Sequence, residues 1–150
     1  MHKQTKHTID FTPDYNFSLY AIAGLLYDFQ LSWEINRIFD ISLKRVENIG
    51  DNVHNDEFIK PFSLYTCRNE EYGLDYSLFQ NRTQKAEILI KDIPNVDYFF
   101  KIKGNRQYID EDKLIKNLSD VKDIMMVYKI KYELLGTKNK TNFLGILLTF

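Results

Sequence analysis

Four acidic side chains stand beside apolar residues in the sequence, where acid–base chemistry would need them. They are Asp28, Glu34, Asp92 and Asp97. Two carboxyl groups held close together titrate at different pH values, so that one can donate a proton while the other accepts one. Three of these acids also have an ordinary structural use: Asp28 can cap a helix, Glu34 can face water on that helix, and Asp92 can occupy a bend. Their spacing brings no two of them together, which favours the structural interpretation.

The sequence carries none of the usual signatures of a catalytic or metal site. It has no glycine-rich phosphate loop, no nucleophile elbow, no paired cysteines and no histidine pair at helical spacing. Its three histidines, His2, His7 and His54, fall in polar stretches where solvent exposure is expected. Cys67 has no activating base beside it. We therefore expect no catalytic residue, no metal and no cofactor.

Four lysines in two alternating segments could form a binding face. They are Lys101 and Lys103 in VDYFFKIKG, and Lys129 and Lys131 in IMMVYKIKY. If the two segments were neighbouring strands, these lysines would share a sheet face that could hold single-stranded nucleic acid by phosphate contacts and base stacking. The net charge of −1 favours instead a solvated face that keeps the sheet soluble. Asp97 would lie on that face as a surface carboxylate among lysines.

Hydrophobic periodicity predicts two helices among a series of strands. The helices are expected at 27–40 and 109–118. Asp110 can cap the second helix, and Ile109 can pack on Leu114. Strands are expected at 16–26, 41–49, 58–69, 73–82, 85–93, 96–104, 124–135 and 142–148, with a polar loop at 51–56. The third and fourth strands read as a hairpin in which Gly73 can take a positive φ. The apolar residues expected to share one face of it are Phe62, Leu64, Leu74, Tyr76 and Leu78.

The order of these elements predicts one α+β domain. A chain of 150 residues suits a single core, and the helices and strands do not alternate as in a doubly wound fold. We expect a flexible arm at 1–14 and a single domain at 15–150, with a large, mostly antiparallel sheet and two main helices on one face. A lone cysteine, no export signal and no apolar run near about 20 residues predict a cytoplasmic protein without membrane contact.

Two stretches resemble the IPExxxVDY family of small bacterial proteins. In LIKDIPNVDYFFKIKG, aligned without gaps, Ile90 matches the first residue of the family motif and 96–98 match its VDY. Lys91 and Asp92 stand where the family has proline and glutamate. The stretch YDFQLSWEINRIFDISL is similar to the aromatic-rich N-terminal region of the family. The resemblance implies a small cytoplasmic domain and gives no residue a catalytic role. The residues that it singles out are Asp28, Trp33, Asn36, Asp97 and Tyr98.

The sequence favours a non-catalytic interaction domain that binds a protein partner or a second copy of itself. Ten Tyr, eleven Phe and one Trp supply the rings that such contacts use, either on the sheet or on the helix of Trp33. Two alternatives remain. One is single-stranded nucleic-acid binding on the four lysines, and the other is a small-molecule enzyme that pairs Asp28 with Asp97.

Overall fold

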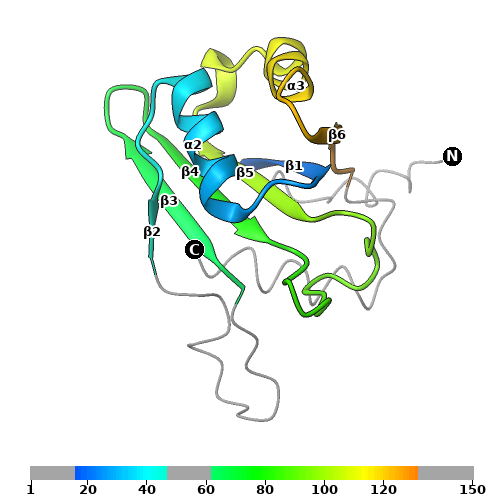
Figure 1. The fold of residues 1–150 in the computed structure, drawn as a ribbon. Coiled ribbons are helices and arrows are strands. Elements are labelled where there is room, and N and C mark those ends of the chain that lie inside the picture. The colour runs from blue at the N-terminus through cyan, green and yellow to red at the C-terminus, as the bar shows by residue number, and fades with distance from the viewer. Residues whose placement is uncertain (1–15, 47–61, 132–150) are drawn as a thin grey trace, which may run out of the picture.

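Six strands form one sheet in the computed structural model, which describes residues 16–46 and 62–131 (Figure 1). They are β1 (Phe17–Gly24), β2 (Lys44–Arg45), β3 (Leu64–Asn69), β4 (Leu74–Gln80), β5 (Tyr98–Gly104) and β6 (Ile124–Lys129). Their order is β2-β3-β4-β5-β1-β6, and every neighbouring pair is antiparallel. The helices are α2 (Asp28–Phe39), α3 (Glu111–Ser119) and the short 3-10 helix η2 (Arg106–Tyr108). This is the expected single-domain α+β fold.

Strand β1 is internal to the sheet, which explains its composition. It pairs with β5 on one side and with β6 on the other. Every residue of FSLYAIAG except the last is buried. A strand that is covered on both faces has few positions for charged side chains, and β1 contains none.

Helix α2 packs an apolar stripe on the sheet. Leu31 and Ile35, one turn apart, are fully buried. At the start of the helix, Gln30 Oε1 accepts the Tyr27 N–H at 2.9 Å. The helix ends at Asp40, whose φ of 54° is left-handed and stops the helical path.

Helix α3 begins as its sequence predicts. Asp110 Oδ1 accepts the Lys113 N–H at 3.1 Å, which satisfies one of the free N–H groups of the first turn. Leu114 and Leu118 lie on the same side of the helix and are buried in an apolar cluster, against which Ile109 also packs. Figure 1 shows that α2 and α3 cover the same face of the sheet.

The turn between β3 and β4 depends on two glycines. Gly73 has a φ of 63°, as predicted for the hairpin. Gly104, at the end of β5, has a φ of 115°, and a Cβ at that position would lie 2.1 Å from the Gly73 carbonyl oxygen. The tip of β5 therefore approaches the hairpin more closely than any side chain would allow.

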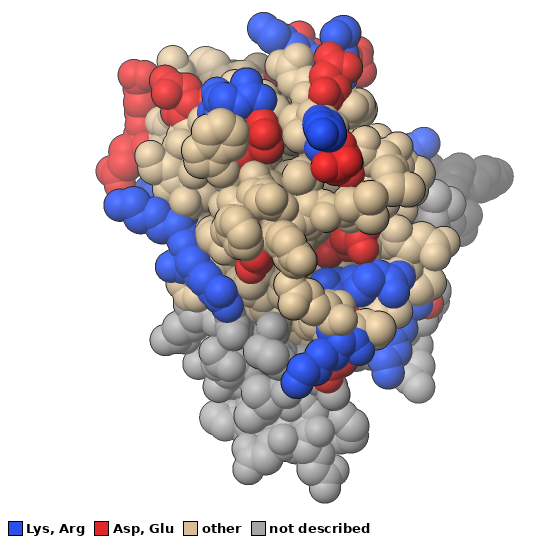
Figure 2. Space-filling model, in the orientation of Figure 1, with Lys and Arg blue, Asp and Glu red and all other residues tan. Residues whose placement is uncertain are grey.

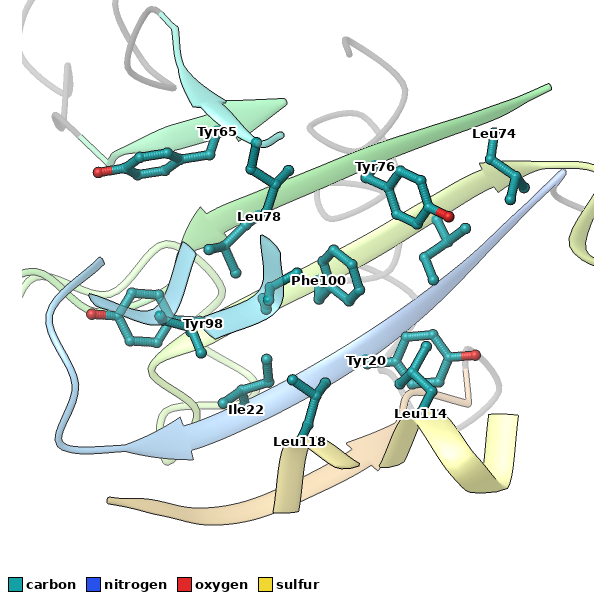
Figure 3. Packing of buried hydrophobic residues seen from close by; sticks show 14 residues of the cluster. Tyr20, Ile22, Tyr65, Leu74, Tyr76, Leu78, Tyr98, Phe100, Leu114 and Leu118 are labelled. Carbon is teal, nitrogen blue, oxygen red and sulfur yellow. The ribbon is translucent and has the colours of Figure 1, made fainter. Parts of the chain in front are cut away.

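The sheet separates two apolar clusters. The helix-side cluster includes rings from several neighbouring strands, as Figure 3 shows, and its buried aromatic members are Tyr20, Tyr65, Tyr76, Tyr98 and Phe100. The far-side cluster contains Phe17, Leu19, Ala21, Leu64, Phe79, Ile90, Val96, Phe99 and Ile130. Consecutive residues of β5 alternate between the two clusters, as a strand requires.

Some strand predictions were wrong. Leu64 lies opposite Phe79 and belongs to the far-side cluster, so it does not share a face with Leu78. Tyr65 lies opposite Leu78 and takes the position beside it that was expected for Leu64. Segment 85–93 forms no strand, because its backbone is bound by a side chain described below, and only an isolated bridge joins Arg82 to Ile88. In the described part of 41–49, the strand is limited to the two residues of β2, and the Val46 N–H donates to the Leu64 carbonyl at 2.9 Å just beyond it. The expectations for 1–14, 51–56, 132–135 and 142–148 lie outside the described residues.

Candidate functional site

Asp97 binds the end of strand β1. Its Oδ2 accepts the Gly24 N–H at 2.9 Å, and its Oδ1 lies 3.4 Å from Nε of Arg82. Its own N–H donates to the Ile22 carbonyl at 2.9 Å. The expectation of a surface carboxylate among lysines was therefore wrong. Asp97 precedes β5, so the alternation of that strand does not fix the direction of its side chain.

Tyr98 holds the next part of the chain. Its hydroxyl donates to the Leu26 carbonyl at 2.6 Å, and the residue is 5% exposed. Burial raises the pKa of this phenol, and the negative charges of Asp28 and Asp97 raise it further, so the hydroxyl keeps its proton and remains a donor. Together with Asp97, Tyr98 fixes the connection between β1 and α2. We call these two side chains the clamp.

Asp28 acts on Tyr98 through its negative charge, but its hydrogen-bond partner differs from that of Asp97. Asp28 is the first residue of α2, and its Oδ1 accepts the Phe29 N–H at 2.8 Å. It lies near Tyr65, whose pKa is raised by burial first and by Asp28 second. The N-cap position expected for Asp28 belongs to Tyr27. The carboxylates of Asp28 and Asp97 thus each accept a backbone N–H, a structural use that was not expected for Asp97.

Asn36 also ties backbone together. Its Oδ1 accepts the Leu43 N–H at 2.7 Å, and its Nδ2 donates to the Leu43 carbonyl at 3.3 Å. These bonds pin the segment that leads from α2 to β2. The side-chain hydrogen bonds of Asn36 thus join α2 to Leu43, which is not part of the clamp.

Asn81 is the polar residue that sequence reasoning missed. It is fully buried, its Oδ1 accepts the Ile90 N–H at 2.7 Å, and its Nδ2 donates to the carbonyls of Ile93 and Val96 at 2.8 and 2.9 Å. Its backbone N–H also donates to the carbonyl of Asp97 at 2.8 Å. One side chain thus organises segment 82–97, which explains why no strand forms there. The available signal was an uncharged polar residue directly after an apolar strand.

Four apolar side chains at the start of α2 are exposed. They are Leu25, Tyr27, Phe29 and Trp33, which are 76%, 52%, 60% and 62% exposed. We call them the α2 patch. Phe29 and Trp33 are four residues apart and so lie one turn apart on the side of α2 away from Leu31 and Ile35. Figure 2 shows an area of uncharged side chains over the middle of this face, with charged side chains around it.

The rings of the α2 patch have defined neighbours. Tyr27 and Phe29 stack with ring centres 5.8 Å apart and planes 6° apart. The guanidinium of Arg37 lies 5.9 Å from the centre of the Trp33 ring, and Arg37 also pairs with Glu34 at 2.5 Å. Trp33 is thus not a core residue.

The four lysines do not share a face. Strand β1 lies between β5 and β6, and Tyr20 is opposite both Phe100 and Lys129, which places Lys129 on the helix side. Lys129 Nζ lies 2.8 Å from Oε2 of Glu111. Lys101, opposite Leu19, is on the far side. The expected common face was wrong because it required β5 and β6 to be neighbours.

Lys101 also differs from the solvated lysine that was expected. It is only 2% exposed, and its Nζ lies 5.0 Å from the centre of the Phe17 ring. Lys103 on the same side is exposed, as is Lys131 beyond the end of β6.

No group of three or more possible metal ligands occurs within residues 16–46 and 62–131. In those same ranges no helix has the length and apolar character needed to cross a membrane.

Comparison with models of protein families finds no matching family, and comparison with curated proteins finds no similar sequence. The resemblance to the IPExxxVDY family stays a prediction. The residues on which it rests nevertheless have physical roles in this fold, since Val96 is buried and Asp97 and Tyr98 form the clamp.

Proposed function

We propose that this chain is a non-catalytic domain that binds a protein partner through the α2 patch. The observation that carries the proposal is the exposure of four large apolar side chains, Leu25, Tyr27, Phe29 and Trp33, on one short stretch of chain. Exposed apolar patches on soluble proteins often mark contact surfaces, and Trp and Tyr are over-represented among the residues that dominate binding energy.

The rigid mounting of the α2 patch supports this role. The clamp residues Asp97 and Tyr98 bind the connection that carries Leu25 and Tyr27, and α2 itself is packed through Leu31. Rings that are held in place before binding lose less conformational entropy when a partner covers them. The expected partner is a protein with an apolar recess for the rings of Phe29 and Trp33.

The two other functions predicted from the sequence have less support. Nucleic-acid binding was to use four lysines on one face, and Lys101 and Lys129 lie on opposite faces. A carboxylate enzyme was to pair Asp28 with Asp97, and both accept backbone N–H groups. A cytoplasmic location stays part of the proposal, because the only cysteine, Cys67, is a free thiol.

The proposal is tested by quantitative affinity capture from native lysate with three baits. They are the wild type, the Phe29→Ala/Trp33→Ala variant, and a control variant, Tyr72→Ala/Tyr108→Ala. The control removes another pair of exposed rings, whose centres are 5.0 Å apart. Circular dichroism first establishes that all three baits are folded.

We expect at least one protein that the wild type and the control recover equally and that the Phe29→Ala/Trp33→Ala variant recovers about tenfold less, as loss of two anchor rings implies. The partner is then purified, and its Kd for each bait is measured. Sedimentation of the pure chain tests whether the partner is a second copy. Equal recovery by all three baits would contradict the proposal, and so would recovery of nothing above the background of empty beads.

A further inference from the structure

Three exposed side chains of α2 follow one another at four-residue spacing. They are Phe29, Trp33 and Arg37, and residues four apart lie one above the other on a helix. Leu31 and Ile35 are buried in the helix-side cluster, so the three exposed side chains lie on the side of α2 that points away from the sheet. We call them the α2 ridge. Along the chain, the ridge presents two aromatic rings and then one cation.

The order of these groups makes the α2 ridge complementary to itself. When a second α2 lies antiparallel on the first and the two Trp33 rings meet at the crossing point, Arg37 of each copy reaches Phe29 of the other, because both are four residues from Trp33. A guanidinium group is attracted to the face of an aromatic ring, and two indoles can stack in an offset arrangement. A parallel arrangement would place Arg37 against Arg37 and lose the contacts with Phe29.

The charges of the α2 ridge do not oppose such a pairing. Arg37 Nη2 lies 2.5 Å from Oε1 of Glu34, so the cation is compensated within each copy. Its guanidinium also lies 5.9 Å from the centre of the Trp33 ring, which holds it beside the ridge before a partner arrives. The whole chain has a net charge of −1, and proteins near zero net charge associate more readily than strongly charged ones.

Helix packing supplies a recess for the rings. Rows of side chains four residues apart form ridges with a groove beside each, and two helices pack such ridges into each other's grooves at an interaxial angle of about −50°. The groove beside the α2 ridge of one copy then receives the rings of the other. Helix α2 contains 12 residues and is therefore ~18 Å long, so the ~12 Å between residues 29 and 37 can lie within the contact.

The size of the α2 patch predicts a weak association. Its four side chains, Leu25, Tyr27, Phe29 and Trp33, are 52–76% exposed. Because a completely covered aromatic ring buries about 150–250 Å², the patch would bury on the order of 400 Å² per copy. A standard stable interface buries about 800 Å² per partner. The contact is thus in the range of transient interfaces, and its occupancy depends on the protein concentration.

We propose that the α2 patch binds the α2 patch of a second copy of this chain, with the two α2 helices antiparallel, and so forms a weak two-fold dimer. This inference rests on the proposed function, because it names the partner of the same surface. A surface that pairs with itself closes after two copies, whereas a surface that pairs with a different one can add further copies. The expected species are therefore monomer and dimer only.

Sedimentation velocity of the complete chain, over a series of protein concentrations, tests the association. We expect a reversible change from monomer to dimer as the concentration rises, without larger species. The Phe29→Ala/Trp33→Ala variant should stay monomeric throughout. The Tyr72→Ala/Tyr108→Ala variant, which removes another exposed pair of rings, should dimerise as the wild type does. Circular dichroism establishes that each variant is folded.

A matched pair of substitutions tests the contact made by Arg37. Arg37→Gln should weaken dimerisation about tenfold, because a two-fold dimer contains each contact twice. Lys113→Gln removes the same charge from an exposed position on α3 and should leave the dimer unchanged.

The orientation of the two helices is tested by NMR on a mixture of isotope-labelled and unlabelled chains. Within one copy, Phe29 and Arg37 are ~12 Å apart along the helix axis, too far for a nuclear Overhauser contact between their backbones. In the antiparallel dimer, the Arg37 side chain of one copy lies on the Phe29 ring of the other. We therefore expect an intermolecular contact between these two side chains in the mixed sample.

Three results would overturn the proposal. They are a chain that stays monomeric at every concentration, a dimer that forms equally well in Phe29→Ala/Trp33→Ala, and a dimer without the contact between Phe29 and Arg37. None of them decides the proposed function, which capture from lysate tests separately. Recovery of a different protein that depends on Phe29 and Trp33 would support the α2 patch as a contact surface even if the pure chain is monomeric.

Discussion

The two sides of the β1–α2 connection are built from opposite chemistry. On the inner side, the polar side chains of Asp97 and Tyr98 bind the backbone of Gly24 and Leu26. On the outer side, the apolar side chains of the α2 patch are exposed. Two polar side chains here form hydrogen bonds to the backbone, and the apolar side chains of the α2 patch are exposed to solvent. The carboxylate of Asp97 and the phenol of Tyr98 therefore bind backbone groups, and three of the four candidate contact residues are aromatic.

Asn81→Ala should have the largest effect on stability, because Asn81, at 0% exposed, is the most deeply buried polar side chain among the described residues. The buried N–H of Ile90 and the carbonyl of Val96 would lose their partner. We expect the free energy of unfolding to fall by about 3–5 kcal/mol, measured by urea denaturation. The control is Asn95→Ala, an exposed asparagine in the same segment, which should change stability little. Equal effects of the two substitutions would contradict the role given to Asn81.

Tyr98→Phe sharpens the comparison by removing a single hydrogen bond. The ring remains in the helix-side cluster, while the Leu26 carbonyl loses its donor. A loss of about 1–2 kcal/mol in the free energy of unfolding is expected. Tyr72→Phe at an exposed ring should have no measurable effect. Hydrogen exchange should also become faster in 25–28 if Tyr98 holds this connection, and unchanged exchange there would refute the clamp.

The pH dependence of stability tests a polar contact of α3, the one made by Glu111. Glu111 accepts hydrogen bonds from Lys129 Nζ at 2.8 Å and from the Tyr20 hydroxyl at 2.6 Å, and these bonds lower the pKa of its carboxyl group. A lowered pKa in the folded state stabilises the protein above the unfolded pKa, and that contribution is lost as pH falls through the folded pKa. Glu111→Gln should therefore be less stable than the wild type at pH 7, with the difference disappearing in acid.

The size of this pH effect should be small. The Glu111 side chain is 41% exposed, so solvent screens its interactions, and the difference at pH 7 is expected to be below about 1 kcal/mol. Urea denaturation of both proteins between neutral pH and about pH 3 measures it. A difference that stays constant over this range would show that the charge of Glu111 is not the cause.

Phe29→Ala/Trp33→Ala should have the smallest effect on stability. Both side chains are mostly exposed, and surface substitutions usually change the free energy of unfolding by no more than about 0.5 kcal/mol each. Thermal and urea denaturation of the double variant provide the measurement. A loss of several kcal/mol would mean that the α2 patch is part of the fold, and the comparison would fail.

Sequence patterns predicted several local elements, although 85–93 forms no strand and the described part of 41–49 contains only the short β2. The period of α2, the Asp110 cap of α3, the buried β1 and the Gly73 turn each follow from a few neighbouring residues, and each is present. Alternation within a strand also placed Lys101 and Lys103 together. These features depend on residues that are close in the sequence, where periodicity and turn chemistry carry information.

What the sequence did not predict depends on distant parts of the chain. The insertion of β1 between β5 and β6 separated Lys101 from Lys129, and no local pattern encodes that order. The partners of Asp97 and Asn81 are backbone groups, which every residue possesses and which leave no mark in the sequence. The exposure of Trp33, by contrast, follows from the local helical spacing of Leu31 and Ile35, which are the residues buried against the sheet.

Site-specific photo-crosslinking tests the central claim most directly. Trp33 is replaced by p-benzoylphenylalanine in living cells, and Tyr108 is replaced in a matched control because it is another exposed ring, at 56%. If the α2 patch is the contact surface for a protein partner, illumination yields a discrete adduct of higher mass from position 33 and none from position 108. No adduct from position 33, or the same adduct from both positions, would contradict the account.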